Sequence, residues 1–416
     1  MFIKKKLNQI FEAAGIKPIR FKDYLNVNTK KIATSGNRAT SKQRIELSGK
    51  AVFFGYHDKT PFSVDNSKVL VNVVEGTGNE PASDKILMKT GYFSLGNDGI
   101  PDQNFIEIGE TTTWNWQQGC MLQWDPQAPN SRVFFNRKVN GEFGSVLYDI
   151  EKKLVIHEYP FPIYSICPNG KYALTLNFQR LGVIKPAYGY PSHIKKEDVE
   201  YVPKDDGLWL YNLENTDYKP IALIDELADF TGRDSYQYLN HATFSPDGKS
   251  LVFFHVFTNA TGKRSIRFYW YQIKTGQKTL LEAEDNVSHY CWKNECEILT
   301  AENHLVNTGY YLYNLKKRIK SKIPLVNVGD IHPMFHPTEK QLLLADTRPD
   351  KKGYQHLMIF NVESNDVQYL GAYHSPETFI HDRRCDLHPR WSKTGNYISI
   401  DTAETGYRSM VILKTE

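Results

Sequence analysis

The chain has 416 residues, 40% of them hydrophobic and 13% aromatic, and a formal net charge of +4 that is spread along its length. This even charge gives no argument for nucleic-acid binding, and the lack of any apolar run of about 18 residues excludes an ordinary transmembrane helix. The many Tyr and Phe residues favour a sheet-rich fold, because aromatic side chains pack well on pleated surfaces.

Residues 1–43 precede the repetitive part of the chain. We expect a short amphipathic helix within residues 1–20, which either packs against the main domain or makes a peripheral contact with an anionic membrane; its apolar face comprises Phe2, Ile3, Leu7, Ile10, Phe11 and Ala14. This stretch lacks the long apolar core of a secretory signal, and residues 23–43 are predicted to be a polar linker. The five cysteines show no paired spacing, which favours free thiols and a cytoplasmic location.

From residue 44 onward, one short unit recurs along the chain. It consists of an aromatic-containing strand, a polar turn and a second, alternating strand, and its copies begin near residues 59, 121, 163, 241, 289, 332 and 388. Repeats of roughly 40 to 60 residues filled with short strands are typical of a β-propeller. We therefore predict an all-β, seven-bladed β-propeller over residues 44–416.

The last unit offers only three strands, the final one near residues 410–413. A four-stranded blade would then lack its outer strand. A strand from the apolar patches in residues 44–54 is predicted to supply it, which closes the ring and removes two exposed sheet edges.

Four histidines occupy the same register in consecutive units, three residues before a Phe or Trp: His241, His289, His332 and His388. Because this register begins the innermost strand of each blade, the four imidazoles should converge on one mouth of the central channel. The longest loops are expected on the same face. Neutral imidazoles with one or two oxygen ligands can hold Mn, Zn or a similar divalent ion, although a histidine at this position can also simply cap its strand.

The same face is expected to gather groups suited to an acidic saccharide. Guanidinium groups bind carboxylates bidentately, and aromatic faces suit sugar rings. The candidate substrate-binding residues are His57, Asp58, Trp116, Gln118, Tyr236, Arg348, Arg383, Arg384 and Arg390, with Arg233 in the loop before His241. The alternative is that the Trp side chains pack between blades and most arginines are solvated.

Two sets of residues resemble known propeller families. The run Phe-Ser-Pro-Asp-Gly-Lys at residues 244–249 resembles the turn of TolB-like repeats. The histidine rim and the His388–Pro389 repeat resemble the oligogalacturonate lyases and, more distantly, the propeller ulvan lyases. In the oligogalacturonate lyases three His and one Gln hold manganese, a further His is the base and an Arg assists. The resemblance implies metal ligands at His289, His332 and His388, with His241 and Arg233 as catalytic residues.

We therefore expect a carbohydrate-active enzyme whose partner is an acidic, uronate-containing oligo- or polysaccharide, and first of all a lyase that works by metal- and Arg-assisted β-elimination. Two alternatives stay open. One is a non-catalytic propeller that binds a glycan or scaffolds a protein. The other is a glycosidase that uses carboxylates such as Asp58 and Asp386.

Overall fold

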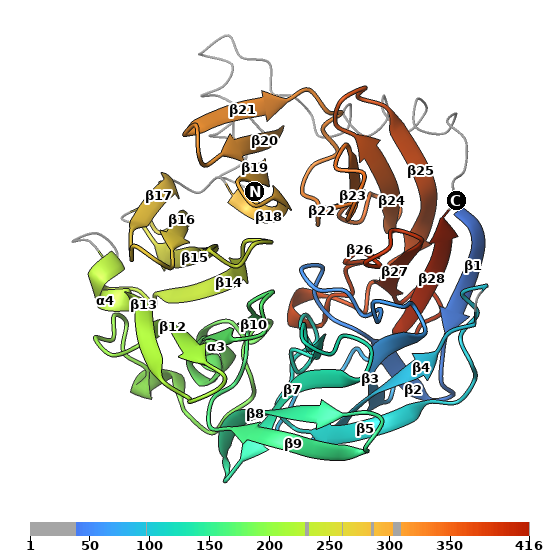
Figure 1. Ribbon diagram of the computed structural model, residues 1–416, viewed down its shortest axis with the longest axis horizontal. Coiled ribbons are helices and arrows are strands. Elements are labelled where there is room, and N and C mark those ends of the chain that lie inside the picture. The colour runs from blue at the N-terminus through green and yellow to red at the C-terminus, as the bar shows by residue number, and fades with distance from the viewer. Residues whose placement is uncertain are drawn as a thin grey trace, which may run out of the picture.

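The computed structural model describes residues 39–415 apart from positions 97, 229–232, 260, 284–286 and 303–308. Across this part of the chain the strands form seven antiparallel four-stranded sheets, arranged as blades around a central axis (Figure 1). The predicted all-β, seven-bladed propeller is confirmed. The helix and membrane contact expected within residues 1–20 lie outside the described residues.

The blades follow one another in chain order, each with its first strand innermost. Blade one comprises β2 (Lys50–Phe53), β3 (Lys68–Glu75), β4 (Met88–Ser94) and β5 (Ile106–Thr111). Blade two comprises β6 (Gln123–Trp124), β7 (Arg132–Val139), β8 (Glu142–Asp149) and β9 (Leu154–Tyr159). Blade three comprises β10 (Ser165–Ile166), β11 (Tyr172–Thr175), β12 (Gly207–Asn212) and β13 (Tyr218–Leu223). Blade four comprises β14 (Tyr238–Phe244), β15 (Ser250–Thr258), β16 (Arg264–Gln272) and β17 (Lys278–Glu282).

Blade five comprises β18 (Val287–Asn294), β19 (Glu297–Glu302), β20 (Gly309–Asn314) and β21 (Ile319–Ile323). Blade six comprises β22 (Met334–Phe335), β23 (Leu342–Asp346), β24 (Tyr354–Asn361) and β25 (Val367–His374). Blade seven comprises β26 (Arg390–Trp391), β27 (Tyr397–Thr402) and β28 (Ser409–Thr415), with β1 (Ala39–Ile45) as its outer strand.

The ring closes through β1, which pairs with β28 in antiparallel register from Ala39 opposite Thr415 to Ile45 opposite Met410. The closing strand therefore lies mostly before the predicted stretch of residues 44–54 and takes up part of the predicted linker. The second apolar patch of that stretch instead forms β2, the innermost strand of blade one, where Phe53 pairs with Asn72 of β3. The correction is physical: an outer strand has a solvated face, so its polar sequence did not mark it as a strand.

The hydrophobic core lies between neighbouring blades and is built mainly from the second and third strands. The first eight residues of β15 are all buried, whereas four of the five residues of the outer strand β21 are exposed. The apolar run of β15, interrupted among these eight residues only by Ser250 and His255, fits a strand that is buried on both faces. Two of the inner strands, β6 and β10, are only two residues long.

The turn at residues 244–249 shows why this sequence recurs. The Ser245 hydroxyl donates to Asp247 Oδ1 at 2.7 Å, and the Lys249 amide donates to the same oxygen at 3.1 Å. Gly248 has φ +68°, a left-handed conformation that glycine adopts without steric cost. The turn therefore fixes where β14 ends and β15 begins, and with it the register of His241.

Polar residues near the end of the second strand bind the next blade. The Asn136 side chain of blade two accepts a hydrogen bond from the Ile163 amide (2.8 Å) and donates to the Ile163 carbonyl (2.9 Å) in blade three. Asp346 of blade six accepts from the His388 amide of blade seven at 3.2 Å. These bonds fix the spacing of adjacent inner strands and so the width of the channel.

The longest described insertion joins β11 to β12 and contains α3 (Phe178–Ile184) and the short helix η1 (Lys196–Asp198). Two other short helices, α4 (Ile224–Leu227) and η2 (His381–Arg383), lie in connections between blades. Among the described residues, no helix has the length and apolar character needed to cross a bilayer.

Candidate functional site

The site is organised by residues 54–61, which leave β2 and enter the central channel. Gly55 has φ +133°, and a Cβ there would lie 2.9 Å from the backbone of Gln118, so only glycine allows this close approach. Asp401 at the end of β27 accepts from the amides of Phe54 and Gly55, both at 3.1 Å. The chain that follows is therefore held firmly against blades two and seven.

Five histidines surround this segment: His57 from the segment itself, and His241, His289, His332 and His388 from the predicted register. The His289 and His332 rings lie 4.3 Å apart, and the His332 and His388 rings 4.5 Å apart, between centroids. His57 completes the group at 5.2 Å from the His332 ring. The predicted convergence of the histidines is therefore observed.

His241 lies on the other side of Tyr56. Its ring stacks on Tyr56 at 4.9 Å and meets the Tyr188 ring edge-on at 5.0 Å. The backbone of His241 has φ +49°, and His388 has φ +43° at the equivalent position. A non-glycine residue in this region is uncommon and is found where the surrounding structure imposes it. Here it turns the two imidazoles into the channel.

In four of the histidines a hydrogen bond at Nδ1 fixes the ring. His57 Nδ1 lies 3.1 Å from the Pro333 carbonyl oxygen, and His388 Nδ1 lies 2.8 Å from that of Gly55. Each carbonyl can only accept, so each Nδ1 carries the proton. His289 and His332 bind carboxylates in the same way, Asp330 at 2.8 Å and Asp346 at 2.9 Å. Each Nε2 then keeps its lone pair. This tautomer, protonated at Nδ1, is one that metal-binding histidines adopt.

Four of the five histidines are held neutral by their surroundings. Burial lowers the pKa of His57, His241, His332 and His388 well below the ordinary value, and neighbouring histidines lower it further. Neutral imidazoles are the form that can bind a metal or accept a proton. The cluster can therefore do either at neutral pH.

One group of side chains fits a divalent ion: His332, Asp386 and His388, whose candidate ligand atoms all lie within 4.8 Å of one another. His388 Nε2 and Asp386 Oδ1 are buried and have no hydrogen-bond partner among the described residues. Buried polar atoms are normally satisfied, so these two indicate a missing partner with positive charge. Of the predicted metal histidines, His332 and His388 belong to this group, and His289 lies next to it.

Two arginines flank the carboxylate of this group. Arg348 Nη1 and Arg384 Nε lie 2.9 Å and 2.6 Å from Asp386 Oδ2. Burial opposes ionisation of Asp386, but the charges of Arg348 and Arg384 outweigh it and lower the pKa of this carboxyl. Both arginine side chains stay about one-third exposed, at 35% and 31%, although Arg348 Nη1 is itself buried, so they can also meet a ligand from solvent.

Five other predicted site residues lie elsewhere. Arg390 is fully buried and binds Asp401 and the carbonyls of Gly55 and Tyr56, so it is structural. Trp116 packs under Arg408 and donates to the Glu80 carbonyl. Arg383 donates to the Asn79 carbonyl on the rim.

The two residues predicted in the loop before His241 are also away from the histidines. Arg233 is 46% exposed and pairs with Asp225 of α4 at 3.0 Å. Tyr236 packs on Tyr201 and donates to the Lys196 carbonyl. Both side chains therefore contact α4 and the insertion of blade three, not the histidines.

Gln118 and Asp58 do lie in the channel. The Gln118 amide donates to the Tyr164 hydroxyl at 2.9 Å, and its Oε1 is buried without a partner among the described residues. Asp58 pairs with Lys59 at 2.9 Å.

The residues that the sequence reasoning missed are the carboxylates that orient the rings, Asp330 and Asp346. One signal was present: Asp330 and Asp386 each stand two residues before a histidine that is followed by proline. This repeated Asp-x-His-Pro pattern places a carboxylate beside the imidazole register in two successive blades.

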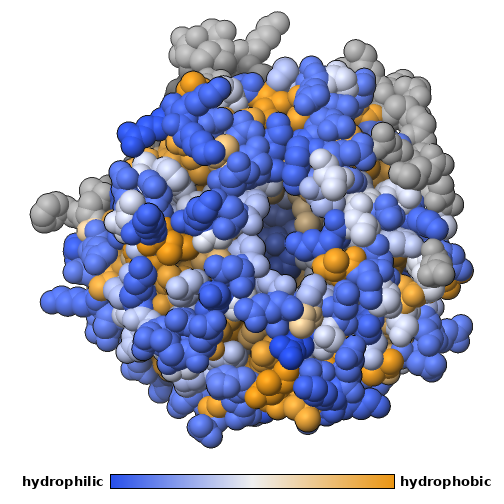
Figure 2. All heavy atoms as spheres, viewed as in Figure 1, coloured by the Kyte–Doolittle hydropathy of each residue, from blue (hydrophilic) through white to orange (hydrophobic). Residues whose placement is uncertain are grey.

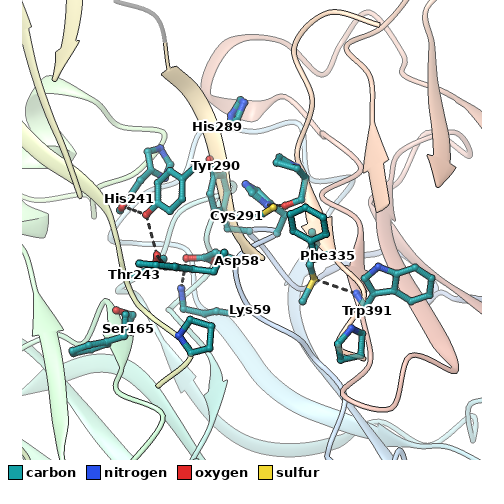
Figure 3. A pocket seen from close by; sticks show the side chains of 18 of the residues that line it. Asp58, Lys59, Ser165, His241, Thr243, His289, Tyr290, Cys291, Phe335 and Trp391 are labelled. Atoms are coloured by element: carbon teal, nitrogen blue, oxygen red, sulfur yellow. Dashed lines mark hydrogen bonds and ion pairs between the residues drawn. The ribbon is translucent and has the colours of Figure 1, made fainter. Parts of the chain in front are cut away.

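A cavity of about 530 Å³ lies in the channel, between the histidines and the turns that follow the inner strands. The end of the cavity nearest the histidine cluster is lined by Tyr56, His57, His241 and His289. The mouth of the cavity is lined by turns that follow the inner strands. Figure 2 shows the hollow at the centre of the ring, with hydrophilic residues inside it. Asp58 and Lys59 lie in its middle, between His241 and Tyr290 on one side and Phe335 and Trp391 on the other (Figure 3).

No protein-family model matches the chain, and no curated protein matches its sequence. Solved structures with a similar fold include an oligogalacturonate lyase in complex with manganese, at 13% identity and TM-score 0.43 over 90% of this chain and 92% of that chain. Another is an oligogalacturonate lyase from Vibrio parahaemolyticus, at 11% identity and TM-score 0.42 over 89% and 92%. TolB from Acinetobacter baumannii matches at 14% identity and TM-score 0.37 over 84% and 64%. At these identities the likeness concerns the propeller fold alone.

Proposed function

We propose that the chain is a carbohydrate-active enzyme that cleaves an acidic, uronate-containing glycan by β-elimination. The observation that carries this proposal is the convergence of five imidazoles in the channel, four of them held neutral by burial, beside two arginines whose side chains stay about one-third exposed. Removing the proton next to a carboxylate requires both kinds of group. A neutral base takes the proton, and positive charge stabilises the negative charge that develops on the carboxylate.

His332, Asp386 and His388 would hold a divalent ion such as Mn²⁺ or Zn²⁺. When bound, the ion would supply Lewis-acid stabilisation of the substrate carboxylate. The two imidazoles and one carboxylate leave coordination positions open, as a catalytic site requires. His289 and His57 line the neighbouring cavity and stay available to orient the sugar.

Each step can be assigned to a side chain. Arg348 and Arg384 bind the uronate carboxylate and orient the sugar ring. Neutral His241 accepts the proton from the carbon next to the carboxylate. The electron pair of that C–H bond forms the new C=C bond as the C–O bond to the leaving sugar breaks. Tyr188, whose ring lies 5.0 Å from the His241 ring, donates a proton to the leaving oxygen. Arg348 and Arg384 thus take the role that the sequence assigned to Arg233.

The test is absorbance at about 235 nm, where the conjugated product of uronate elimination absorbs. Purified protein is assayed on polygalacturonate and related uronate polymers after elemental analysis, with added Mn²⁺ or Zn²⁺ and with chelator. We expect an absorbance rise that the chelator suppresses. His241→Ala should lower turnover roughly a hundredfold to ten-thousandfold at an unchanged melting temperature, because it removes a positioned base.

Arg233→Ala is the matched control, since Arg233 lies outside the channel and pairs only on the surface. It should keep full activity. If no uronate polymer is cleaved with either metal, the lyase proposal fails and a glycan-binding propeller remains. If cleavage persists at full rate in His241→Ala, the base has been assigned to the wrong residue.

A further inference from the structure

The cavity below the histidines opens on the face opposite the arginines. The inner strand β22 follows His332 and ends at the turn that holds Pro337 and Lys340, and both turn residues line the cavity. Arg348 follows the other end of the neighbouring strand β23, so it belongs to the opposite face. Neither Arg348 nor Arg384 lines the cavity. The histidines are therefore approached from two sides, and the proposed reaction binds the substrate carboxylate on the side of the arginines.

The middle of the cavity offers an unsatisfied hydrogen-bond acceptor. Asp58 Oδ2 binds the Lys59 ammonium at 2.9 Å, while Asp58 Oδ1 is buried and has no hydrogen-bond partner in the part of the chain that the structure describes. Asp58 lies centrally among the lining side chains (Figure 3). An unpaired buried carboxylate oxygen is costly, so a ligand hydroxyl that donates to it would be favoured.

The mouth of the cavity carries two ammonium groups, on Lys340 and Lys393. No described carboxylate forms an ion pair with either of them, whereas Lys249 in the equivalent turn of blade four pairs with Asp247 at 3.3 Å. Burial lowers the pKa of Lys340, and the charge of Lys393 adds to this effect. Two neighbouring cations without an acidic partner favour an anion between them.

The walls between these polar ends are aromatic. Tyr290, Trp292, Phe244 and Phe335 line the cavity, and the Trp292 indole is fixed by its hydrogen bond to Thr243 Oγ1 at 3.1 Å. Flat aromatic faces suit the apolar faces of sugar rings. The volume of about 530 Å³ is within the range of small-ligand pockets.

We propose that this cavity is a second binding site, which takes one anionic sugar with its acid group at Lys340 and Lys393 and its hydroxyl groups on Asp58. Because the charge of Asp58 in the middle of the cavity is paired with Lys59, the two ammonium groups at the mouth set the orientation, with the acid group outward. A uronate and a sugar phosphate share the required chemistry. The choice of a uronate as first probe rests on the proposed function, but the site itself does not.

The test is calorimetric titration of the full chain with galacturonate, galactose 6-phosphate and galactose. We expect the wild type to bind one or both anionic sugars more tightly than galactose. Lys340→Ala/Lys393→Ala should weaken anion binding by about tenfold to a hundredfold, the usual contribution of hydrogen bonds to charged groups. The relative affinity of the two anions tells which source of negative charge the site prefers.

Lys249→Ala is the control, because it removes the same charge from the same kind of turn on the same face. It should bind like the wild type. Asp58→Asn is a second variant, which should weaken binding of all three sugars alike. Equal anion binding by the double lysine variant and the wild type would overturn the proposal, as would galactose binding as tightly as both anions, or no binding of any sugar.

Arg348→Ala distinguishes binding in the cavity from binding at Arg348 and Arg384. This variant should still bind galacturonate in the calorimetric titration. Loss of this binding would overturn the second site. Failure of the lyase proposal is recognised independently, since a protein without absorbance change on uronate polymers can still bind a monosaccharide here.

Discussion

Arginines of the channel show how burial decides the role of a side chain. Arg390 and Arg348 were equal candidates for substrate binding in the sequence. Arg390 is fully buried and its guanidinium is used up by Asp401 and by the carbonyls of Gly55 and Tyr56. Arg348 keeps one-third of its side chain exposed while it pairs with Asp330 and Asp386. The first holds the channel segment in place, and the second can meet a ligand.

Replacing Arg390 with Met should therefore destabilise the fold and not only the site. Asp401 is 3% exposed and would remain as a buried carboxylate without its cation. Breaking such a pair costs about 3–5 kcal/mol. The measurement is the free energy of unfolding in urea. Arg233→Ala, at an exposed ion pair, should change it by less than about 1 kcal/mol. Similar small effects in both variants would contradict the structural role of Arg390.

The pH profile of the proposed reaction should show the lowered pKa of His241. Burial lowers it first, and the nearby His289, His57, Arg264 and His332 lower it further. The base must be neutral, so kcat/KM rises as the pH rises through this pKa. The acidic limb should then lie clearly below pH about 6.5, the ordinary value for histidine. Tyr188→Phe should keep this limb while it lowers the rate. A limb at or above the ordinary value would contradict the assignment of His241 as the base.

At the scale of elements, the repeat units located the inner strands of six blades, whereas the inner strand of blade one, β2, precedes the unit near residue 59, and the carboxylates that orient the histidines were not predicted. The histidine register could be read because one His stands three residues before an aromatic residue in four units. Asp346 could not be linked to His388 in this way, since the contact joins the end of β23 to the start of the next blade. The contacts of Arg233 and Tyr236 could not be predicted for the same reason, because a sequence gives the length of a loop but not its direction.

The closing strand leads to a prediction about truncation. Removing residues 1–38 leaves all the described strands intact, so the shortened chain should melt in one cooperative transition. Removing residues 1–45 deletes β1 and exposes the edge of β28, which should lower the melting temperature and promote association between chains. Thermal melts and light scattering on both truncations check this. Identical melts and no association would show that β1 is dispensable.

At the scale of the whole molecule, the ring brings together residues that lie hundreds of positions apart. His388 Nδ1 donates to the Gly55 carbonyl, and Asp401 holds the amides of Phe54 and Gly55. Composition and repeat spacing were enough to predict the propeller and its seven units. They could not predict the two faces of the histidine cluster, because these depend on how residues 54–61 cross the channel. The cavity on the short-turn side is a product of that crossing.

During synthesis, β1 is made long before β28, the strand with which it pairs. Ala39 leaves the ribosome 376 residues (415 − 39) before its partner Thr415, which at about 5–20 residues per second is a delay of about 20–75 s. During this time β1 is a strand without a neighbour on a nascent chain. Its sequence, Ala-Thr-Ser-Lys-Gln-Arg-Ile, has two positive charges and a single large apolar residue. Such a strand is a poor template for pairing with other chains. The polar sequence, because of which β1 was not predicted as a strand, therefore also protects the growing protein from aggregation.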